Sequence, residues 1–391
     1  MASQGRAEGA EVAADRRSKL RAMRLSRGAF IGSSLGISAL AARMPLRAVA
    51  AAPNMAIAPV QIDAGRVIRT VVGLRPFRAS GFVLRAEPFG AKVLVHNYGH
   101  GGGGFSLSWG CATLAADLVA NRSASRAAVL GCGVIGLTTA RILQNRGWQV
   151  TIYAAGLPPA TTSNLAGAQW TPTSVFLAQA VTPAFLAIFR EASRIANRAF
   201  QLMVGPAYGV RWIDNYDLKR DADSIGGELD NANRLGIADL YADIETIDPA
   251  ALPFVGFKNI QRFATMLMEP NTFLPAVERD FLLQGGRIVV RTFHSPSDVA
   301  ALHEPVVFNC TGLGSRELFS DNVLEPVRGQ LSILEPQPAI DYIYLAAGPL
   351  YMFPRSDGIA LGGTFERGNW STEVDLATQA RILAAHEALF G

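Results

Sequence analysis

The chain has 391 residues, of which 49% are apolar, so it is long enough to bury one large core or two joined cores. Its formal net charge of +4 comes from residues 1–52, which carry nine Lys or Arg and three Asp or Glu; the remainder has 27 basic and 29 acidic residues. This balance excludes a strongly basic body that would bind nucleic acid.

The three cysteines, Cys111, Cys132 and Cys310, are far apart and odd in number, which argues against a disulfide framework. The five histidines show no ligand spacing, so we expect no metal site.

Residues 1–52 have the order of an export signal. An Arg-rich start is followed by the apolar run Gly28 to Ala42 and by small residues before Pro53. The run is too short to span a membrane. Ser26 to Ile31 resembles a twin-arginine motif, with Gly28 at the place of the second arginine. We therefore expect an exported protein, with the twin-arginine route favoured; the alternative is an N-terminal extension that is not a signal.

Residues Val67 to Phe77 and Lys92 to His96 read as strands. The second strand runs into four consecutive glycines, Gly101 to Gly104, and a helix is expected from Ser106 to about Ala120. Glycines between a strand and a helix allow the backbone to approach a flat ligand, and the helix start offers free N–H groups. The alternative is a flexible glycine loop without a ligand.

The stretch Ala127 to Tyr153 predicts a strand, a glycine turn, a helix and a second strand. The turn, Gly131-Cys-Gly-Val-Ile-Gly136, has the spacing that places a pyrophosphate at a helix N-terminus. An acid normally follows the second strand and holds the ribose, but Ala155 and Gly156 stand there. The stretch indicates a dinucleotide site whose ribose contacts come partly from elsewhere.

The rest of the chain alternates further helices and strands. Polar, loop-rich sequence is expected over 221–250, and Arg355 is expected in a turn that faces solvent. The expected helices are 183–204, 271–284 and 373–390, and the expected strands are 208–217, 287–292, 306–309, 329–334, 350–353 and 359–364.

Six motifs together resemble the D-amino-acid oxidase family of flavoproteins. They are GLRPFR, HNYGHGGGGFSLSWG, GCGVIGLTTA, TTSNLAGAQWTP, VFNCTGLGS and YMFPRSDGIALGGTFERGNW. In familiar members the first two come last. Here they come first, and the chain ends at Gly391, where the family would continue into GLRP. The order indicates a circular permutation, which is tolerable where termini lie close together. It predicts that Gly391 lies near the start of the strand that holds Arg75.

The resemblance implies an α/β fold of two domains: a Rossmann-type FAD-binding domain and an interleaved substrate domain with an antiparallel sheet. We expect residues 53–75, 93–182, 256–318 and 373–391 in the FAD-binding domain, and residues 76–92, 183–255 and 319–372 in the substrate domain.

The resemblance also implies FAD as the cofactor and assigns the site residues. Arg75 would bind the substrate carboxylate, Tyr351 would close over it, and the Gly102 carbonyl would accept from the substrate amine. The residues expected to contact FAD are Gly101, Gly103, Gly104, Phe105, Ser106, Gly131, Gly133, Val134, Ile135, Gly136, Thr161, Thr162, Gly167, Ala168, Gln169, Cys310 and Thr311.

The expected activity is FAD-dependent oxidative deamination of D-amino acids or close relatives, with oxygen or another electron acceptor. The family commonly has a second tyrosine four residues before Tyr351, where this chain has Ala347. That change suggests a wider pocket, so oxidation of N-methyl or cyclic amino acids is an alternative. A nicotinamide-dependent dehydrogenase and a non-catalytic flavoprotein are further alternatives.

Overall fold

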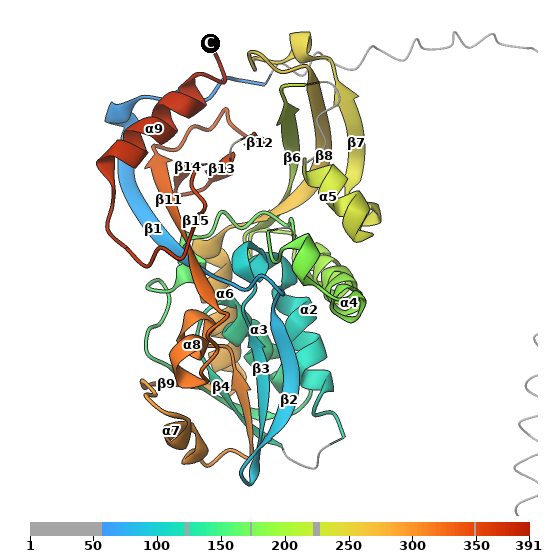
Figure 1. The fold of residues 1–391 in the computed structure, drawn as a ribbon, viewed down its shortest axis with the longest axis vertical. Coiled ribbons are helices and arrows are strands. Elements are labelled where there is room, and N and C mark those ends of the chain that lie inside the picture. Colours follow the sequence, from blue (N-terminus) through green and yellow to red (C-terminus); the bar gives the residue numbers. More distant parts are fainter. Residues whose placement is uncertain (1–56, 122–124, 173, 222–226, 348) are drawn as a thin grey trace, which may run out of the picture. The chain divides into compact units, whose positions relative to one another are not determined.

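The computed structural model describes residues 57–121, 125–172, 174–221, 227–347 and 349–391, shown as the coloured ribbon in Figure 1. The predicted export signal lies outside these residues. The described residues form two β-sheets with helices packed on them. The predicted α/β class is confirmed.

The first sheet has nine strands and is mostly antiparallel, with β12 and β6 running parallel. In spatial order its strands are β1 (Val67–Phe77), β11 (Glu325–Leu334), β14 (Gly358–Gly362), β13 (Leu350–Arg355), β12 (Tyr342–Ala346), β6 (Val210–Lys219), β8 (Asn259–Met268) and β7 (Ala242–Ile247), and β15 (Glu366–Arg367) pairs with β11.

The second sheet has six strands, and all its pairings are parallel except that of β2 with β3. In spatial order it contains β2 (Val83–Phe89), β3 (Lys92–Tyr98), β10 (Val306–Asn309), β4 (Arg126–Leu130), β5 (Gln149–Ala154) and β9 (Arg287–Val290). Its central strands β4 and β10 are apolar apart from Arg126 at the start of β4 and Asn309 at the end of β10, because both faces of a parallel sheet are covered.

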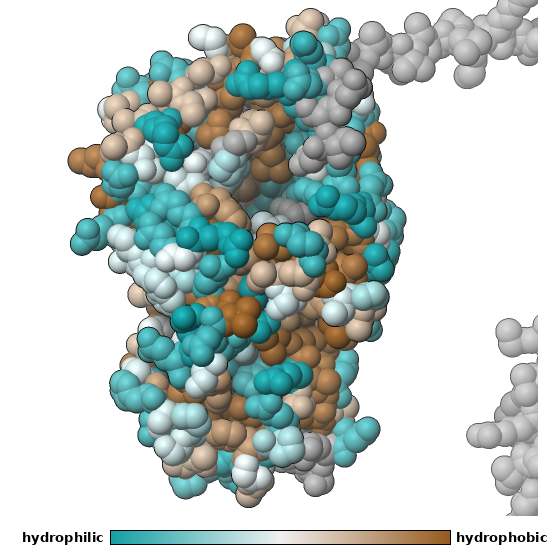
Figure 2. All heavy atoms as spheres, viewed as in Figure 1, coloured by the Kyte–Doolittle hydropathy of each residue, from teal (hydrophilic) through white to brown (hydrophobic). Residues whose placement is uncertain are grey.

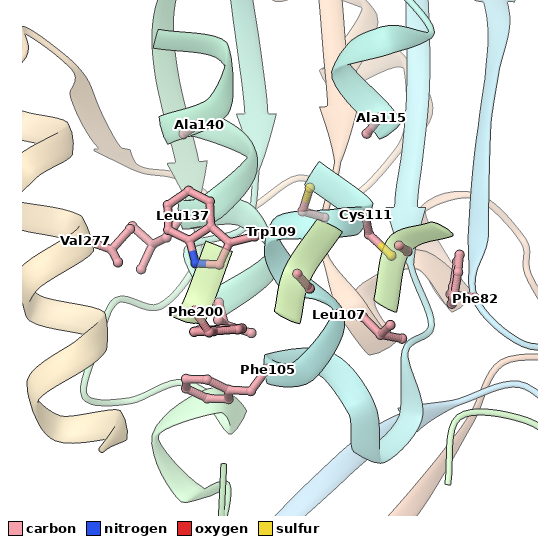
Figure 3. Packing of buried hydrophobic residues seen from close by; sticks show 14 of the residues in the cluster. Phe82, Phe105, Leu107, Trp109, Cys111, Ala115, Leu137, Ala140, Phe200 and Val277 are labelled. Atoms are coloured by element: carbon pink, nitrogen blue, oxygen red, sulfur yellow. The ribbon is translucent and has the colours of Figure 1, made fainter. Parts of the chain in front are cut away.

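Four helices of 12 to 19 residues pack around one hydrophobic cluster, seen from close by in Figure 3. They are α2 (Gly104–Asp117), α3 (Val134–Asn145), α4 (Pro183–Gln201) and α6 (Pro270–Leu283). Helix α2 carries no charged residue before Asp117, and residues 105–112 are all buried. A helix that is apolar on every side belongs in a core. Accordingly Trp109 of α2 lies beside Leu137 of α3.

The other α-helices of the described residues are α5 (Glu228–Leu235), α7 (Pro296–Ala300), α8 (Ser315–Leu318) and α9 (Leu376–Glu387), of which α9 is as long as α3. Helix α5 and strand β7 lie in the stretch that we expected to be loop. Every residue of β7 before Ile247 is exposed, so its sequence lacks the alternation that marks a half-buried strand.

The sheets divide the chain differently from the domain division that we expected. We expected most of β1, and all of β8 and α9, in the FAD-binding domain. Strand β1 is instead the edge strand of the nine-stranded sheet, β8 is a strand of the same sheet, and α9 packs on it. Strand β2, expected in the substrate domain, pairs with β3 in the six-stranded sheet. The physical reason for β1 is backbone pairing with β11, a distant segment that local sequence does not specify. Strand β2 instead forms a hairpin with β3, the next strand in the chain.

The C-terminal helix lies beside the segment that leads into β1, as the permuted motif order predicts. Val60 and Leu389 belong to one buried cluster, and Val67 and Phe390 pack against it. Figure 1 shows the C-terminal helix α9, in red, close to the blue start of the described chain.

His386 ties α9 to the nine-stranded sheet. It is fully buried; its Nε2 donates to the Gly362 carbonyl at 2.8 Å, and its Nδ1 accepts from the Tyr344 hydroxyl at 2.6 Å. Burial lowers the pKa of His386 to about 4. The imidazole is therefore neutral in the folded protein at neutral pH.

This burial predicts an acid-sensitive contribution to stability. As pH falls from about 6.5 to 4, His386 takes up a proton in the unfolded chain but not in the folded protein, so the free energy of unfolding falls by up to about 1.4 kcal/mol per pH unit. The variant His386→Gln keeps a donor and an acceptor but does not titrate. We expect denaturant titrations to show a shallower pH dependence between pH 6.5 and 4 for this variant. Parallel pH curves for the two proteins would contradict the assignment.

Candidate active site

A cavity of about 990 Å³ contains nearly all the residues that the sequence singled out. Its volume is at the upper end of the range of about 300–1,000 Å³ typical of small-molecule and cofactor sites. It is lined by the glycine turn after β4, the glycine run after β3, the segment 160–169 and one face of the nine-stranded sheet. Segments from across the chain therefore meet at a single site.

The glycine turn after β4 has the geometry that brings a ligand to a helix start. Gly131 has φ +104°, and a Cβ there would lie 2.5 Å from the Cys310 carbonyl oxygen. Helix α3 begins at Val134, whose backbone N–H donates to Ser163 Oγ at 3.0 Å. Gly133, Val134 and Ile135 line the cavity. Free N–H groups and the helix dipole favour an anion at such a place.

The wall of the cavity at the end of β5 carries no carboxylate at the two positions that follow this strand. Ala155 and Gly156 line the cavity directly after that strand, as the sequence indicated. Thr161, Thr162, Cys310 and Thr311 also line it. Burial raises the pKa of the Cys310 thiol to about 12, so this cysteine contributes packing and not charge.

The glycine run forms a short 3-10 turn, Gly101–Gly103, that leads into α2. Gly101, Gly102, Gly104 and Phe105 line the cavity, and the N–H of Gly102 donates to the Ser174 carbonyl at 3.1 Å. The N-terminus of α2 therefore borders the cavity.

The segment Gly167 to Gln169 borders the cavity as well. It is held by hydrogen bonds to β8, in which Met268 N–H donates to the Ala168 carbonyl at 2.9 Å. Ala168 has φ +58°, so the segment makes a sharp local bend.

Three predicted contact residues do not line the cavity. Gly136 permits close packing, because a Cβ there would lie 2.0 Å from the Gly131 carbonyl oxygen. Gly103 closes the turn by donating to the His100 carbonyl at 3.0 Å. Ser106 is buried, and its Oγ donates to the Gln169 carbonyl at 3.1 Å. All three position cavity-lining segments and do not face the cavity themselves.

Arg75 and Tyr351 meet in the cavity from two strands of the nine-stranded sheet. Arg75 Nη2 donates to the Tyr351 hydroxyl at 2.8 Å. Arg75 Nη1 is buried and has no hydrogen-bond partner in the described part of the chain. A guanidinium with an unpaired buried donor fits a carboxylate, which accepts two parallel hydrogen bonds.

The sequence did not single out three further residues that line the cavity, Glu228, Arg291 and Leu345. Glu228 begins α5, in the stretch expected to be loop. Arg291 directly follows β9, which pairs with β5, and its N–H donates to the Ala154 carbonyl at 2.9 Å. A ligand site lies at the carboxyl ends of parallel strands, so the position of Arg291 after β9 was an available signal.

The described residues contain no group of three or more His, Cys, Asp or Glu side chains that could hold a metal ion. None of their helices is both long and apolar enough to cross a membrane. Figure 2 shows hydrophilic and hydrophobic side chains intermixed on the face in view.

The polar atoms around the cavity fit the expected FAD and its substrate. Four cavity-lining residues carry buried polar atoms without a partner in the described chain: Arg75 Nη1, Asn97 Oδ1, His100 Nε2 and Gln169 Oε1. Each unpaired buried polar group costs about 1–3 kcal/mol, so such a cluster indicates a polar ligand. Burial lowers the pKa of His100 to about 3, so it faces the cavity as a neutral ring.

Residues 126–391 match the family described as "DAO: FAD dependent oxidoreductase". The chain is 33% identical over 269 residues to the D-amino-acid oxidase of Streptomyces coelicolor, and the match covers 67% of this chain and 76% of that protein. It is 32% identical over 276 residues to the D-amino-acid oxidase of Rubrobacter xylanophilus, and this match covers 68% of this chain and 78% of that protein. The solved glycine oxidase from Geobacillus kaustophilus has a TM-score of 0.50 at 17% identity, covers 68% of this chain and 78% of that chain, and shows a likeness of fold.

The family match begins at Arg126, yet β1, β2, β3 and α2 precede it and complete the two sheets and the cavity. The elements ahead of the match are therefore part of the same fold. This chain belongs to the family of FAD-dependent oxidoreductases that is described as DAO.

Proposed function

We propose that the protein oxidises the α-amine of D-amino acids, or of closely related amines, and yields keto acids. The observation that carries this proposal is Arg75. Its guanidinium has one donor held by Tyr351 and one buried donor without a partner, in the cavity lined by the glycine motifs of a flavoprotein family.

The chain's own residues bind and orient the substrate. Arg75 would hold the carboxylate by a fork of two N–H groups, and Tyr351 would fix the guanidinium and add a hydrogen bond. The carbonyl of Gly102 would accept from the neutral substrate amine. When bound, FAD supplies the redox chemistry by accepting a hydride from the substrate Cα. No dedicated base is needed, because the protein contributes position and electrostatics.

The residues that would hold FAD are those of the glycine turn, with Thr161, Thr162 and Thr311. The N-terminus of α2 would stabilise negative charge on the reduced ring. The product imino acid would hydrolyse in water to a keto acid and ammonia.

Family membership favours FAD over a nicotinamide cofactor. Oxidation of N-methyl or cyclic amino acids is the second candidate, because Ala347 stands where the family commonly has a tyrosine and is exposed. Ala346 and Pro349, on either side of this position, line the cavity.

Export directed by residues 1–52 stays a prediction from the leader sequence.

The test is anaerobic mixing of the purified protein with a panel of D-amino acids, their L-enantiomers, and N-methyl and cyclic amino acids. We expect the protein to purify yellow and its flavin absorbance to bleach with D-amino acids, with ammonia and keto acid released on reoxidation. A protein that remains colourless after incubation with FAD contradicts the proposal. Bleaching by L-amino acids alone would also contradict it.

A further inference from the structure

Strand β5 ends without the acid that usually holds the adenosine ribose of a bound dinucleotide. In such units a carboxylate after the second strand accepts hydrogen bonds from the ribose hydroxyls. Here Ala155 and Gly156 stand at that place and line the cavity. A ribose bound there needs a partner from another segment of the chain.

The strand register brings a cation to this place. Strands β5 and β9 are parallel, and Ala154 at the end of β5 lies opposite Val290 at the end of β9. One residue further along both strands, Ala155 and Arg291 are therefore neighbours, about one strand spacing of 4.8 Å apart. The Arg291 N–H donates to the Ala154 carbonyl at 2.9 Å, which continues the pairing of the two strands.

The Arg291 side chain is exposed and lines the cavity. It belongs to the segment between β9 and α7 in Figure 1. Its Cζ lies 4.7 Å from the centroid of the Phe293 ring, which also lines the cavity, so a cation–π contact orients the guanidinium. Burial and the nearby Glu304 raise the pKa of Tyr153, another cavity residue, and the charge of Arg291 opposes this effect. The guanidinium is therefore close to the cavity wall that β5 forms.

Arg75 and Arg291 are the two Lys or Arg residues among the described residues that line the cavity. Arg75 fits the substrate carboxylate, which leaves Arg291 for a second polar group of the bound molecules. No carboxylate forms an ion pair with Arg291 in the described parts of the chain. Its position beside the missing acid sets it apart from other exposed arginines, which need no partner.

A guanidinium in place of the acid changes the sign of the charge at the ribose. A carboxylate accepts hydrogen bonds from the two ribose hydroxyls and repels a phosphate group attached to them. A guanidinium donates to the hydroxyl oxygens and accommodates such a phosphate. Its planar set of donors suits either group.

We propose that Arg291 donates hydrogen bonds to the adenosine ribose of FAD, in place of the acid that is missing after β5. The ribose edge of the site is then cationic and accepts a ribose 2′-phosphate. This inference goes beyond the proposed function, because it concerns the cofactor and holds for any amine that the protein oxidises.

The first measurement is the equilibrium titration of the full-length apoprotein with FAD, followed by flavin fluorescence. We expect Arg291→Gln to lower the affinity for FAD by about 10- to 100-fold, the range for hydrogen bonds to a charged group. The matched control is Arg287→Gln, which removes the same charge at the other end of β9. Arg287 is exposed and does not line the cavity, so its replacement should leave the affinity for FAD unchanged.

The second measurement tests the sign of the charge with two probes that compete with FAD for the apoprotein. They are adenosine 5′-monophosphate and adenosine 2′,5′-bisphosphate. We expect the bisphosphate to displace FAD from the wild type at about 10-fold lower concentration. Arg291→Gln should remove this preference, and Arg291→Glu should reverse it, because a carboxylate repels the 2′-phosphate. Arg287→Gln should keep the wild-type order.

An unchanged affinity for FAD in Arg291→Gln would overturn the inference, since Arg291 would then only cover Phe293. Equal losses in Arg291→Gln and Arg287→Gln would also overturn it, because the effect would come from overall charge. So would a wild type that binds the monophosphate as tightly as the bisphosphate, a comparison that needs no variant. All these readouts are of nucleotide binding, so failure of every D-amino acid to reduce the flavin would overturn the proposed function alone.

Discussion

Replacing Arg75 by leucine is expected to weaken substrate binding by about 10- to 100-fold, because charge-assisted hydrogen bonds of roughly 1.5–3 kcal/mol in all are lost. A larger loss is expected in the rate of flavin reduction, since a loosely held substrate is no longer oriented for hydride transfer. Flavin binding should survive, because Arg75 contacts Tyr351 and lies on a strand of the nine-stranded sheet, whereas the glycine turn follows β4 of the six-stranded sheet. The measurement is the rate of flavin reduction against substrate concentration.

The matched variant for this prediction is Arg75→Lys. Lysine keeps the charge but not the fork of two donors, so we expect only partial recovery. A second check is Tyr351→Phe, which removes the partner of Nη2 and should weaken binding less than Arg75→Leu does. If Arg75→Leu leaves both the apparent affinity and the reduction rate unchanged, the carboxylate is held elsewhere.

Replacing Gly131 by alanine is expected to lower FAD affinity by at least about 10-fold and stability by about 1–3 kcal/mol. The backbone there has φ +104°, and the new Cβ would lie 2.5 Å from the Cys310 carbonyl oxygen. Either β10 or the glycine turn must move, and the turn carries the N–H groups of the α3 N-terminus toward the cavity. The measurements are denaturant unfolding and titration of the apoprotein with FAD.

The control for Gly131 is Gly147→Ala. Gly147 also has a positive φ, +84°, but a Cβ there would meet nothing within 4 Å. This variant shares the conformational cost, about 1–2 kcal/mol for a left-handed alanine, without the collision. We expect it to lose stability and keep its FAD affinity. Equal FAD affinities for the two variants would show that the contact with Cys310 does not shape the site.

The local sequence was sufficient for the dinucleotide unit. Gly131, Gly133 and Gly136 lie within six residues, between an apolar strand and a helix of suitable period, so their joint role follows from short-range geometry. The glycine run before α2 was readable for the same reason, although the helix begins at Gly104 and not at Ser106. The pairing of Arg75 with Tyr351 was available only through the family resemblance, because 276 residues separate them along the chain.

The expectation that Arg355 faces solvent was wrong. Its Pro-Arg-Ser-Asp-Gly context is that of a solvent-facing turn, but the side chain is 5% exposed. Its guanidinium pairs with Asp357 and donates to the Ala166 carbonyl at 2.9 Å, beside the segment that borders the cavity. The contact with Ala166 crosses 189 residues of chain, and no local pattern encodes it.

By itself, the sequence determined the fold class, the glycine motifs and the permuted order, because these depend on spacing within short segments. The tertiary structure alone decided which sheet each segment joins and what faces the cavity. Strands β1 and β2 follow each other in the chain but belong to different sheets, and Glu228 enters the cavity from a stretch that reads as loop. The physical reason is that β1 pairs with β11 and the cavity walls meet through contacts between residues distant in sequence, whose partners local propensity does not specify, whereas β2 pairs with its neighbour β3.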